Sequence, residues 1–427
     1  MLNVKVLRDD RVRAEEGLRK RNFSTEQLEQ IDEVIALDDA RKATQKDLDE
    51  RLAEVNQLSR QIGELFKQGQ SDGANAMRSA VAKQKDEIKT LESRSKEIDE
   101  ALMEALYLLP NIPHSSVPAG AEADDNEVVE DWKGSIPTFE GFDALPHWEL
   151  AEKYKLIDFK RGVKITGSGF PLFRGKGARL ERALINFFLQ EAHLAGYEEI
   201  APPLLVNEDS ARATGQLPDK EGQMYHAERD NLYLIPTAEV PVTNIFRDEI
   251  VETRELPIML TGYTPCFRRE AGSYGSDVKG LNRVHQFDKV EIVQMTLPSE
   301  SYHVLEQMVE HVKSLLVKLK LPFRILRLCG GDLGFTSALT YDFEVFSAAQ
   351  GKWLEVSSVS NFETFQSHRL NLRHRQGNKK PELVHTLNGS ALALARIVAA
   401  ILENNQTSTS INIPEVLHAY TGFEEIC

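Results

Sequence analysis

The sequence is poor in cysteine: three thiols stand among 427 residues, at Cys266, Cys329 and Cys427. Three scattered cysteines exclude a disulfide framework and a cysteine-based zinc site, so we expect a protein of a reducing compartment, the cytoplasm. Long apolar runs are missing too, because the nearest one, residues 391–402, is interrupted by Arg396 and is too short to cross a membrane. The N-terminus is too charged for a signal peptide. We therefore expect no membrane association.

The common phosphate-binding loops are absent as well. No G-x-x-x-x-G-K-[ST] pattern occurs, and no dinucleotide fingerprint follows a predicted strand. The glycines of residues 167–172 are better explained as a turn before a helix over 177–196. Cations are also in deficit, since 51 lysines and arginines face 66 acidic residues and leave a net charge of −15. This charge disfavours nucleic acid as a partner, although binding depends on local patches rather than on the total.

What the chain does have is length and a change of pattern along it. Its hydrophobic content of 41% and charged content of 27% are ordinary for a globular protein, and 427 residues suffice for two or three domains. We predict a helical arm over residues 1–109 and a mixed domain of helices and strands over 146–427. Residues 110–145 are rich in proline, glycine and acids, which predicts a linker with an entry strand.

The arm has the periodicity of a long helical hairpin. Ser24 offers an N-cap, with Gln27 three residues later. Apolar positions recur at spacings of four and three on both sides of a turn predicted over residues 69–75, as in an antiparallel coiled coil. The outer part, residues 51–96, carries nine cations against six acids. The repeating positions are Leu48, Leu52, Val55, Ser59 and Ile62 before the turn, and Met77, Val81, Gln84, Ile88, Leu91, Ser95, Ile98, Leu102 and Ala105 after it.

A mildly basic rod predicts a grip on structured RNA, through its backbone and shape. A rod that binds another protein, or nothing, is the open alternative. The basic run at residues 19–21 is interpreted either as a phosphate contact or as a solvated helix end.

One stretch carries most of the chemistry. It is predicted to form two strands, residues 266–270 and 285–292, joined by a connection that contains Gly272, Gly275 and Gly280. Side chains alternate along a strand, so each strand presents one set of residues on a single face. These sets are Arg268 and Glu270 on the first strand, and His285, Phe287, Lys289 and Glu291 on the second.

These groups suit a nucleotide coupled to a small polar acid. Arg268 can clamp a phosphate or a carboxylate, and Phe287 can stack on a base. Glu270 can accept from an exocyclic amine, and Glu291 from a hydroxyl or an amine. The strand separates Phe287 from Glu291 by roughly 13 Å, which leaves adenine at one end and an amino acid at the other. For the arginine and glutamate taken alone, a salt-bridged surface hairpin is the alternative.

The pattern F-R-R-E, a glycine-containing connection and H-Q-F-D-K-V-E resembles motif 2 of the class II aminoacyl-tRNA synthetases, in the form found in the seryl-tRNA synthetases. Residues 196–207 are similar to motif 1 of that family, whose proline, here Pro203, lies at a twofold dimer interface. The tripeptide at residues 237–239, predicted as an extended loop, matches the T-x-E loop that binds the amino group of serine. Residues 389–396 match motif 3, G-x-x-x-x-x-x-R. We expect it as a strand that ends in a glycine turn, then a helix with Arg396 about two turns in.

The resemblance spans nearly the whole chain and implies an α+β fold. An antiparallel class II sheet flanked by helices would follow an N-terminal coiled-coil arm. It implies a homodimeric cytoplasmic enzyme that activates L-serine with ATP to seryl-adenylate. The enzyme would then transfer serine to the 3′ end of serine tRNA, with selenocysteine tRNA as a further option. In the family the arm contacts the long variable arm of the tRNA, and the acceptor end enters the catalytic site.

The resemblance also implies roles for individual residues. Arg268 and Arg396 would be catalytic through charge neutralisation. Serine would be held by Thr237, Ala238, Glu239, Glu291 and Ser390. ATP would be held by Arg268, Arg269, Glu270, Val284, Phe287, Glu355, Val356, Ser357, Ser358 and Arg396.

A metal corner is predicted on two strands, residues 342–345 and 354–358. Glu355 and Ser358 offer the oxygen ligands that Mg²⁺ prefers, and Glu344 is an optional second carboxylate. Polar residues at a sheet edge are the alternative. Ser357 has no nearby base and is interpreted as a binding hydroxyl.

Two other functions stay open. One is a relative that makes an aminoacyl-adenylate but loads a carrier protein, against which the arm argues. The other is a coiled-coil scaffold with a degenerate catalytic body, against which the intact set Arg268, Glu270, Glu355 and Arg396 argues.

Overall fold

The computed structural model describes the whole chain except residue 220 and residues 272–278. It divides into two compact units, which are described separately. The smaller unit comprises Leu2–Arg19 and Phe23–Pro110, and the larger comprises Met1, Lys20–Asn22 and Asn111–Cys427. The segment predicted as a linker therefore clusters with the larger unit. Its entry strand is observed as β1 (Glu127–Asp131).

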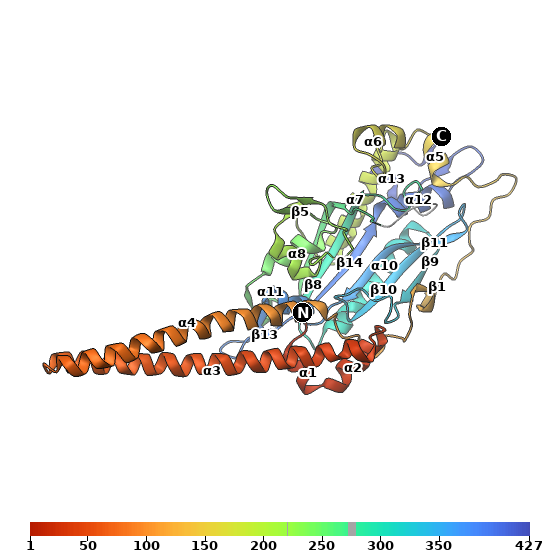
Figure 1. Cartoon of the computed structure of the whole chain (residues 1–427). Coiled ribbons are helices and arrows are strands. Elements are labelled where there is room, and N and C mark those ends of the chain that lie inside the picture. The colour runs from red at the N-terminus through yellow and green to blue at the C-terminus, as the bar shows by residue number, and fades with distance from the viewer. Residues whose placement is uncertain (220, 272–278) are drawn as a thin grey trace. The chain divides into compact units, whose positions relative to one another are not determined.

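The smaller unit is helical. Its two long helices, α3 and α4, run side by side as an antiparallel pair in the orange-red part of the ribbon (Figure 1). Its core along the pair is formed by Leu48, Val55, Val81 and Ile88, which are positions of the predicted apolar repeat. The helices are α1 (Val4–Asp9), α2 (Arg11–Lys20), α3 (Thr25–Lys67) and α4 (Ser71–Leu108).

The ends of these helices test the local predictions. Ser24 caps α3 as expected: the Gln27 N–H donates to Ser24 Oγ at 3.2 Å, and the Ser24 N–H donates to Gln27 Oε1 at 2.8 Å. The predicted turn over residues 69–75 was too long, because α4 already begins at Ser71. Asp72 lies in its first turn, where a negative charge stabilises the helix dipole, so the serine and aspartate start a helix here rather than extend the turn.

Two residues of the basic run at 19–21, Lys20 and Arg21, donate to backbone carbonyls of the protein. For these two, neither the solvated helix end nor the phosphate contact predicted from the sequence describes the structure. Within the larger unit, Lys20 Nζ donates to the carbonyls of Ser115 and Val117 at 2.9 and 2.8 Å. Arg21 is used in the same way. Its guanidinium donates to the carbonyls of Asn111, Leu333, Gly334 and Ser337.

Among the described residues, the larger unit is built on an eight-stranded sheet in which neighbouring strands are antiparallel, except that β2 and β7 are parallel. Across the sheet the order is β1 (Glu127–Asp131), β9 (Phe323–Arg327), β10 (Leu339–Ser347), β11 (Lys352–Asn361), β14 (His385–Ala393), β8 (Gln286–Thr296), β7 (Ile258–Phe267) and β2 (Glu198–Glu199).

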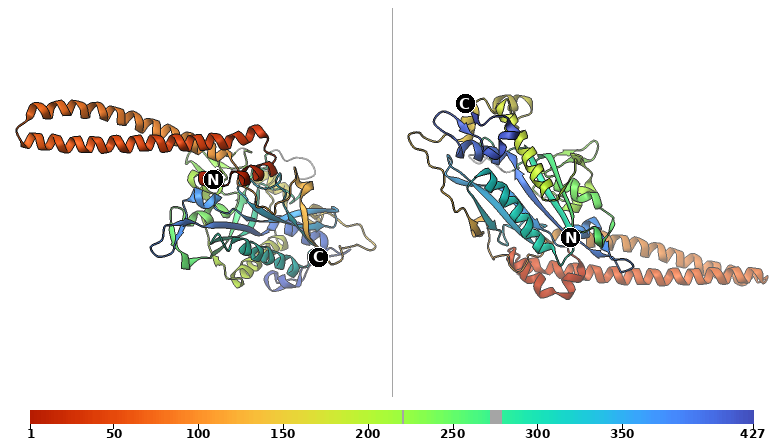
Figure 2. Two further views of the ribbon diagram at one scale, coloured as in Figure 1. Left: turned by 90° about the horizontal axis from the view of Figure 1, so that it is seen from below. Right: turned by 180° about the vertical axis from the view of Figure 1, so that it is seen from behind.

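Helices pack against this sheet, and three of them share its main hydrophobic core. These are α7 (Lys176–Leu194), α10 (Ser301–Leu319) and α12 (Leu394–Asn404), and α7 and α10 are seen over the sheet in the rear view of Figure 2. The amphipathic helices α7 and α10 bury their apolar sides in this core, whereas α12 is buried at every position except Arg396. The remaining helices of the unit are α5 (His147–Lys153), α6 (Phe159–Ile165), α8 (Glu208–Thr214), α9 (Glu239–Thr243), α11 (Phe365–Leu370) and α13 (His418–Thr421).

Small sheets and short helices complete the unit. No helix in the described part of the chain is long and apolar enough to cross a membrane. The short strands are β3 (Leu205–Val206), β4 (His226–Ala227) and β5 (Leu232–Leu234) in one sheet, β6 (Ile250–Glu252), β12 (Arg373–Arg375) and β13 (Glu382–Leu383) in another, and β15 (Ile411–Asn412) with β16 (Glu425–Ile426).

Candidate active site

A cavity of about 490 Å³ lies in the larger unit and gathers the predicted site residues. Strand β8 explains its position, because its side chains alternate between two faces. Val290 and Ile292 point into the hydrophobic core, whereas Phe287, Lys289 and Glu291 line the cavity. Of the predicted residues, the lining contains Thr237, Glu239, Arg268, Glu270, Val284, Phe287, Glu291, Glu355, Val356, Ser357, Ser358, Ser390 and Arg396. Ala238, which is fully buried, and Arg269 are not part of it.

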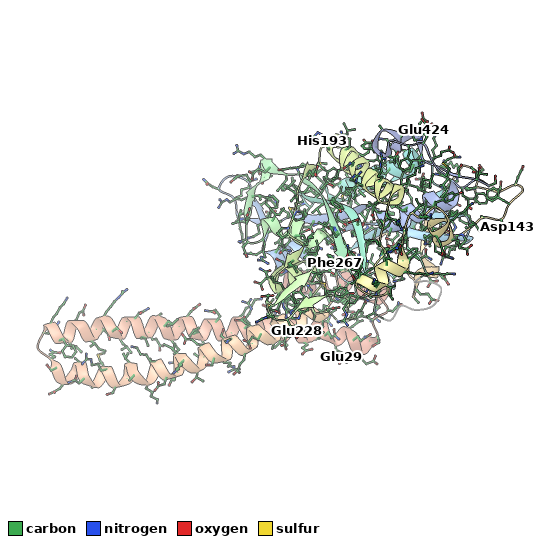
Figure 3. The ribbon with its side chains drawn as sticks, turned by 90° about the horizontal axis from the view of Figure 1, so that it is seen from above. Glu29, Asp143, His193, Glu228, Phe267 and Glu424 are labelled. Carbon is green, nitrogen blue, oxygen red and sulfur yellow. The ribbon has the colours of Figure 1, made fainter. Side chains whose placement is uncertain are left out.

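The first strand of the motif 2 hairpin is shorter than predicted. It was expected to reach Glu270 but ends at Phe267, which is labelled in Figure 3, and Glu270 adopts a positive φ of 48°. Arg268 and Glu270 therefore do not alternate along a strand. They reach the cavity because the chain turns after Phe267, where the Arg268 N–H still donates to the His285 carbonyl at 2.9 Å. Residues 272–278, with the predicted Gly272 and Gly275, lie outside the described residues.

Arg268 is held in the cavity wall by a backbone carbonyl and an aromatic ring. Its Nε donates to the carbonyl of Pro236 at 3.3 Å, and its guanidinium carbon lies 5.3 Å from the centre of the Phe287 ring. An arginine over an aromatic face gains a favourable cation–π interaction. At the rim, Arg283 Nη1 donates to Glu270 Oε2 at 3.1 Å, which holds that carboxylate against the cavity wall.

The end of the cavity around Glu291 is a buried polar network. Glu291 is 1% exposed, and its Oε2 accepts from Thr237 Oγ1 at 3.1 Å and lies 2.7 Å from Lys289 Nζ. Its Oε1 accepts from the Asn388 side-chain amide at 3.1 Å. Ser390 pairs with Glu291 across β14 and β8. Both oxygens of this buried carboxylate therefore have hydrogen-bond or ion-pair partners.

Glu239 is the second buried carboxylate of this end. Burial raises its pKa to about 7, and the nearby Glu291 charge adds to the rise. The Gln366 side chain, which donates to Glu239 Oε1 at 2.6 Å, opposes it, as do Lys289 and Arg268. Two carboxylates at one end of a small cavity, with the pKa of one raised in this way, are suited to receive an ammonium group.

The loop that carries Glu239 was predicted to be extended. In the structure it turns into a helix at this residue. Ala238 has right-handed helical dihedrals and Glu239 is the first residue of α9. The Glu239 N–H donates to Thr237 Oγ1 at 3.2 Å, so Thr237 contacts both the start of the helix and Glu291. The spacing of two therefore brings both side chains to one place through a helix start.

Arg396 lies at a different position in the secondary structure from the predicted one. Strand β14 continues through Gly389 to Ala393, and α12 starts at Leu394, so Arg396 lies in the first helical turn rather than two turns in. Its Nε donates to the Asn282 carbonyl at 2.9 Å, and its Nη1 donates to the Glu355 carbonyl at 2.6 Å. Two backbone carbonyls thus fix the plane of this guanidinium.

The predicted metal corner lies on β10 and β11 beside Arg396. Asp342 pairs with Ser358 in the register of these strands, and burial, with the nearby Glu355 charge, raises the pKa of Asp342. Its Oδ1 is buried without a hydrogen-bond partner among the described residues. Glu344, expected as an optional second carboxylate, pairs with Arg324, and neither Glu344 nor Asp342 is part of the cavity lining. In this register Glu344 lies opposite Glu355 and Asp342 lies opposite Ser358, so two acids of β10 flank the predicted metal corner.

Several cavity residues were missed from the sequence. Alternation had already set Lys289 on the face of Glu291, and the same rule sets Asn388 on the face of Ser390, so a signal existed for both. No local signal pointed to Asn282, which shapes the cavity through its backbone carbonyl, or to Gln366, which contacts Glu239 from a distant helix.

The chain is similar to known proteins over its whole length. A family model described as "tRNA synthetase class II core domain (G, H, P, S and T)" matches residues 223–405, and one described as "Seryl-tRNA synthetase N-terminal domain" matches residues 1–113. A serine–tRNA ligase of Salinibacter ruber is 51% identical over 100% of this chain and 99% of its own length. One of Chlorobaculum parvum is 46% identical, with 100% of both chains covered. A crystal structure of the seryl-tRNA synthetase of Pyrococcus horikoshii with ATP superposes with a TM-score of 0.90, at 34% identity over 100% of this chain and 99% of that one.

Proposed function

The chain belongs to the seryl-tRNA synthetase family of class II aminoacyl-tRNA synthetases, and on this premise we propose how its cavity holds the two substrates that it joins. The enzyme is a serine–tRNA ligase: it activates L-serine with ATP to seryl-adenylate and transfers the serine to tRNA. Our proposal concerns the residues that do so, the metal ion, the tRNA contacts and the dimer.

One observation carries the assignment of residues. Arg268, Phe287, Glu291 and Arg396 come from different parts of the fold and line the same cavity. A clamp for anions, a ring for a base and a carboxylate for a small polar group are what a mixed anhydride of an amino acid and AMP requires.

We assign serine to the end of the cavity around Glu291. Thr237 and Glu239 receive its ammonium group, and Glu291 with Ser390 receives its hydroxyl. The raised pKa of Glu239 supports this orientation, because an ammonium group relieves the repulsion from Glu291. Lys289 balances the charge of Glu291 and holds its carboxylate in place. The carboxylate is thereby oriented to accept a hydrogen bond from the serine hydroxyl.

We assign ATP to the end between Arg268 and Arg396. Phe287 stacks on adenine, while Glu270 and the backbone of Val284 frame its edge. Arg268 bridges the serine carboxylate and the α-phosphate, and Arg396 lies against the nucleotide and its γ-phosphate. The planar guanidinium groups suit phosphate oxygens, and both already have a fixed orientation without the ligand.

The chemistry then needs no protein nucleophile. The serine carboxylate oxygen attacks the α-phosphorus in line, the bond to the bridging oxygen breaks, and pyrophosphate leaves with that electron pair. Arg268 and Arg396 neutralise the charge that accumulates, and the cavity walls align the reactants. In the second step a hydroxyl of the terminal ribose of tRNA attacks the carbonyl carbon, and AMP leaves.

The donor set at the metal corner fits Mg²⁺. Glu355 and Ser358 offer hard oxygen atoms, and the unpartnered Oδ1 of Asp342 lies beside them. No group of three histidine, cysteine or acidic residues in the described part of the chain forms a metal cage of its own. We propose that Glu355 and Ser358 share the ion with ATP phosphates, where it would neutralise charge on the triphosphate.

The remaining partners follow from the family. We propose that the basic outer part of the α3–α4 hairpin contacts the variable arm of serine tRNA and that its acceptor end enters the cavity. We propose a homodimer with Pro203 at its interface, and the cytoplasm as the place of action. We propose selenocysteine tRNA as a further substrate.

Serine-dependent exchange of pyrophosphate into ATP, run with each amino acid in turn, tests the assignment of the cavity. We expect exchange with serine and a loss of several orders of magnitude with alanine, which lacks the hydroxyl that Glu291 receives. Equal exchange with alanine would remove Glu291 from the specificity site. Replacing residues 27–105 by a short linker separates the rivals: tRNA charging should be lost while exchange remains.

A further inference from the structure

A buried pair of residues outside the assigned site is connected to the nucleotide end of the cavity. His147 is the first residue of α5, Glu403 lies in the last turn of α12, and both side chains are fully buried. His147 Nδ1 lies 2.7 Å from Glu403 Oε1, and the backbone N–H of His147 donates to the same oxygen at 2.9 Å.

The protonation of the pair follows from its third partner. His147 Nε2 accepts the backbone N–H of Leu281 at 2.8 Å, so this nitrogen carries no proton. The imidazole proton is then on Nδ1 and is donated to Glu403. Burial by itself would raise the pKa of Glu403, but the hydrogen bonds from His147 and Ser347 hold it below its usual value, so Glu403 is a carboxylate.

The backbone that His147 contacts is the end of the motif 2 connection. Gly280 has a φ of 69°, and a Cβ atom there would lie 2.2 Å from His147 Nε2. The chain therefore passes directly against the imidazole ring. Leu281 and Asn282, the next two residues, line the cavity.

A second connection closes the network. Gln350 Nε2 donates to Glu403 Oε1 at 2.9 Å, and Gln350 Oε1 accepts from the Asn282 amide at 2.9 Å. The Asn282 carbonyl in turn accepts from Arg396 Nε. Since Arg396 and Glu403 both lie on α12, the helix holds the loop end, and the loop end orients the arginine.

We propose that His147 is a positioning residue for ATP: its Nε2 fixes the Leu281 amide and thereby the Asn282 carbonyl that orients Arg396. The inference rests on the proposed placement of ATP between Arg268 and Arg396. It extends the site to a histidine that touches no substrate and whose whole effect passes through the backbone.

A matched pair of variants tests the direction of this effect. His147→Asn keeps a donor at the Nδ1 position but has no atom at Nε2, whereas His147→Gln reaches the Nε2 position with an acceptor oxygen. In pyrophosphate exchange, His147→Asn should raise the KM for ATP about tenfold, the cost of one unsatisfied buried amide. The KM for serine should change less than about twofold, and His147→Gln should restore most of the ATP affinity.

One control and one further variant separate positioning from general damage. His374→Asn removes another buried imidazole, whose Nδ1 lies 2.9 Å from Thr253 Oγ1 and which does not line the cavity, and it should leave both KM values unchanged. Gln350→Ala removes a partly buried side chain that bridges Asn282 and Glu403, and it should raise the KM for ATP by about threefold at unchanged KM for serine.

Hydrogen exchange of the Leu281 amide gives a readout that does not depend on activity, and it should be faster in His147→Asn than in the wild type and in His147→Gln. The proposal is overturned if both KM values rise together, if Asn and Gln behave alike, or if Leu281 exchange is unchanged. A wild type without serine-dependent exchange would instead refute the substrate assignment, and the Leu281 comparison would still test His147.

Discussion

The Nζ atom of Lys289 lies 2.7 Å from Oε2 of Glu291, and both side chains are almost completely buried. A buried pair of this kind is costly to break from one side, because the remaining charge loses its partner. The pair therefore links the stability of the cavity to the group to which we assign selection of the amino acid.

Glu291→Ala should abolish serine activation and spare ATP. The serine hydroxyl loses its acceptor and Lys289 becomes an unpaired buried charge, so kcat/KM for serine should fall at least about 10³-fold. The KM for ATP should stay within about threefold. Pyrophosphate exchange at varied serine and ATP measures both, and Glu382→Ala, an exposed carboxylate on β13, is the control. Unchanged serine-dependent exchange would refute the role of Glu291.

Glu239→Gln should stabilise the empty enzyme at alkaline pH while weakening serine binding. The folded-state pKa of about 7 lies above the ordinary value of 4.5, so the native state binds more protons between these values and stability falls as pH rises through this window. At pH 8 the substitution should raise the free energy of unfolding by roughly 2–3 kcal/mol, with little effect near pH 5. Urea unfolding at both pH values measures this, and an equal effect at both would contradict it.

Arg396→Lys should impair the use of ATP although the charge is kept. A lysine cannot donate in one plane to the Asn282 and Glu355 carbonyls and also face phosphate oxygens. We expect kcat/KM for ATP to fall about 10²-fold, as for the loss of one oriented donor. Steady-state exchange kinetics give the value, with Arg375→Lys on β12 as the control. A drop confined to serine would place Arg396 at the wrong end of the cavity.

Glu355→Gln should raise the magnesium requirement. Its carboxylate is exposed at the metal corner, and an amide oxygen is a weaker ligand for a hard cation. The Mg²⁺ concentration for half-maximal exchange should rise about 10-fold or more, and the rate should recover at high Mg²⁺. Glu344→Gln, which breaks the pair with Arg324 instead, serves as the comparison and should leave the requirement unchanged. A raised Mg²⁺ requirement in Glu344→Gln but not in Glu355→Gln would assign the metal ligand to Glu344 instead of Glu355.

The combined substitution Lys83→Gln, Lys85→Gln and Lys89→Gln should weaken tRNA without touching activation. All three side chains are exposed on α4. If they face phosphates, the KM for tRNA should rise, and the slope of its logarithm against the logarithm of salt concentration should fall by roughly one per lost contact. Exchange of pyrophosphate without tRNA is the internal control. A KM for tRNA that is unchanged at every salt concentration would contradict a role of these three lysines in RNA binding.

Much of the candidate site could be predicted because its signals are local. Alternation along β8 is a property of any strand, so Phe287 and Glu291 had to share a face once the strand formed. The Ser24 cap and the apolar repeat of α3 and α4 likewise depend only on neighbouring residues.

Errors occurred where an element ends. Strand β7 stops before Arg268, α4 starts at Ser71, and α12 starts late enough to place Arg396 in its first turn. Local pattern constrains such boundaries weakly, because pairing with distant segments decides where a strand stops gaining hydrogen bonds.

The sequence by itself therefore determined which side chains are candidates for the chemistry, and the period of the elements that present them. Only the tertiary structure decided their partners: Lys289 against Glu291, Asn282 beneath Arg396, Gln366 on Glu239 and His147 behind Leu281. These contacts join residues that are mostly far apart along the chain. They exist because burial forces each polar group to find a donor or an acceptor wherever the packed chain supplies one.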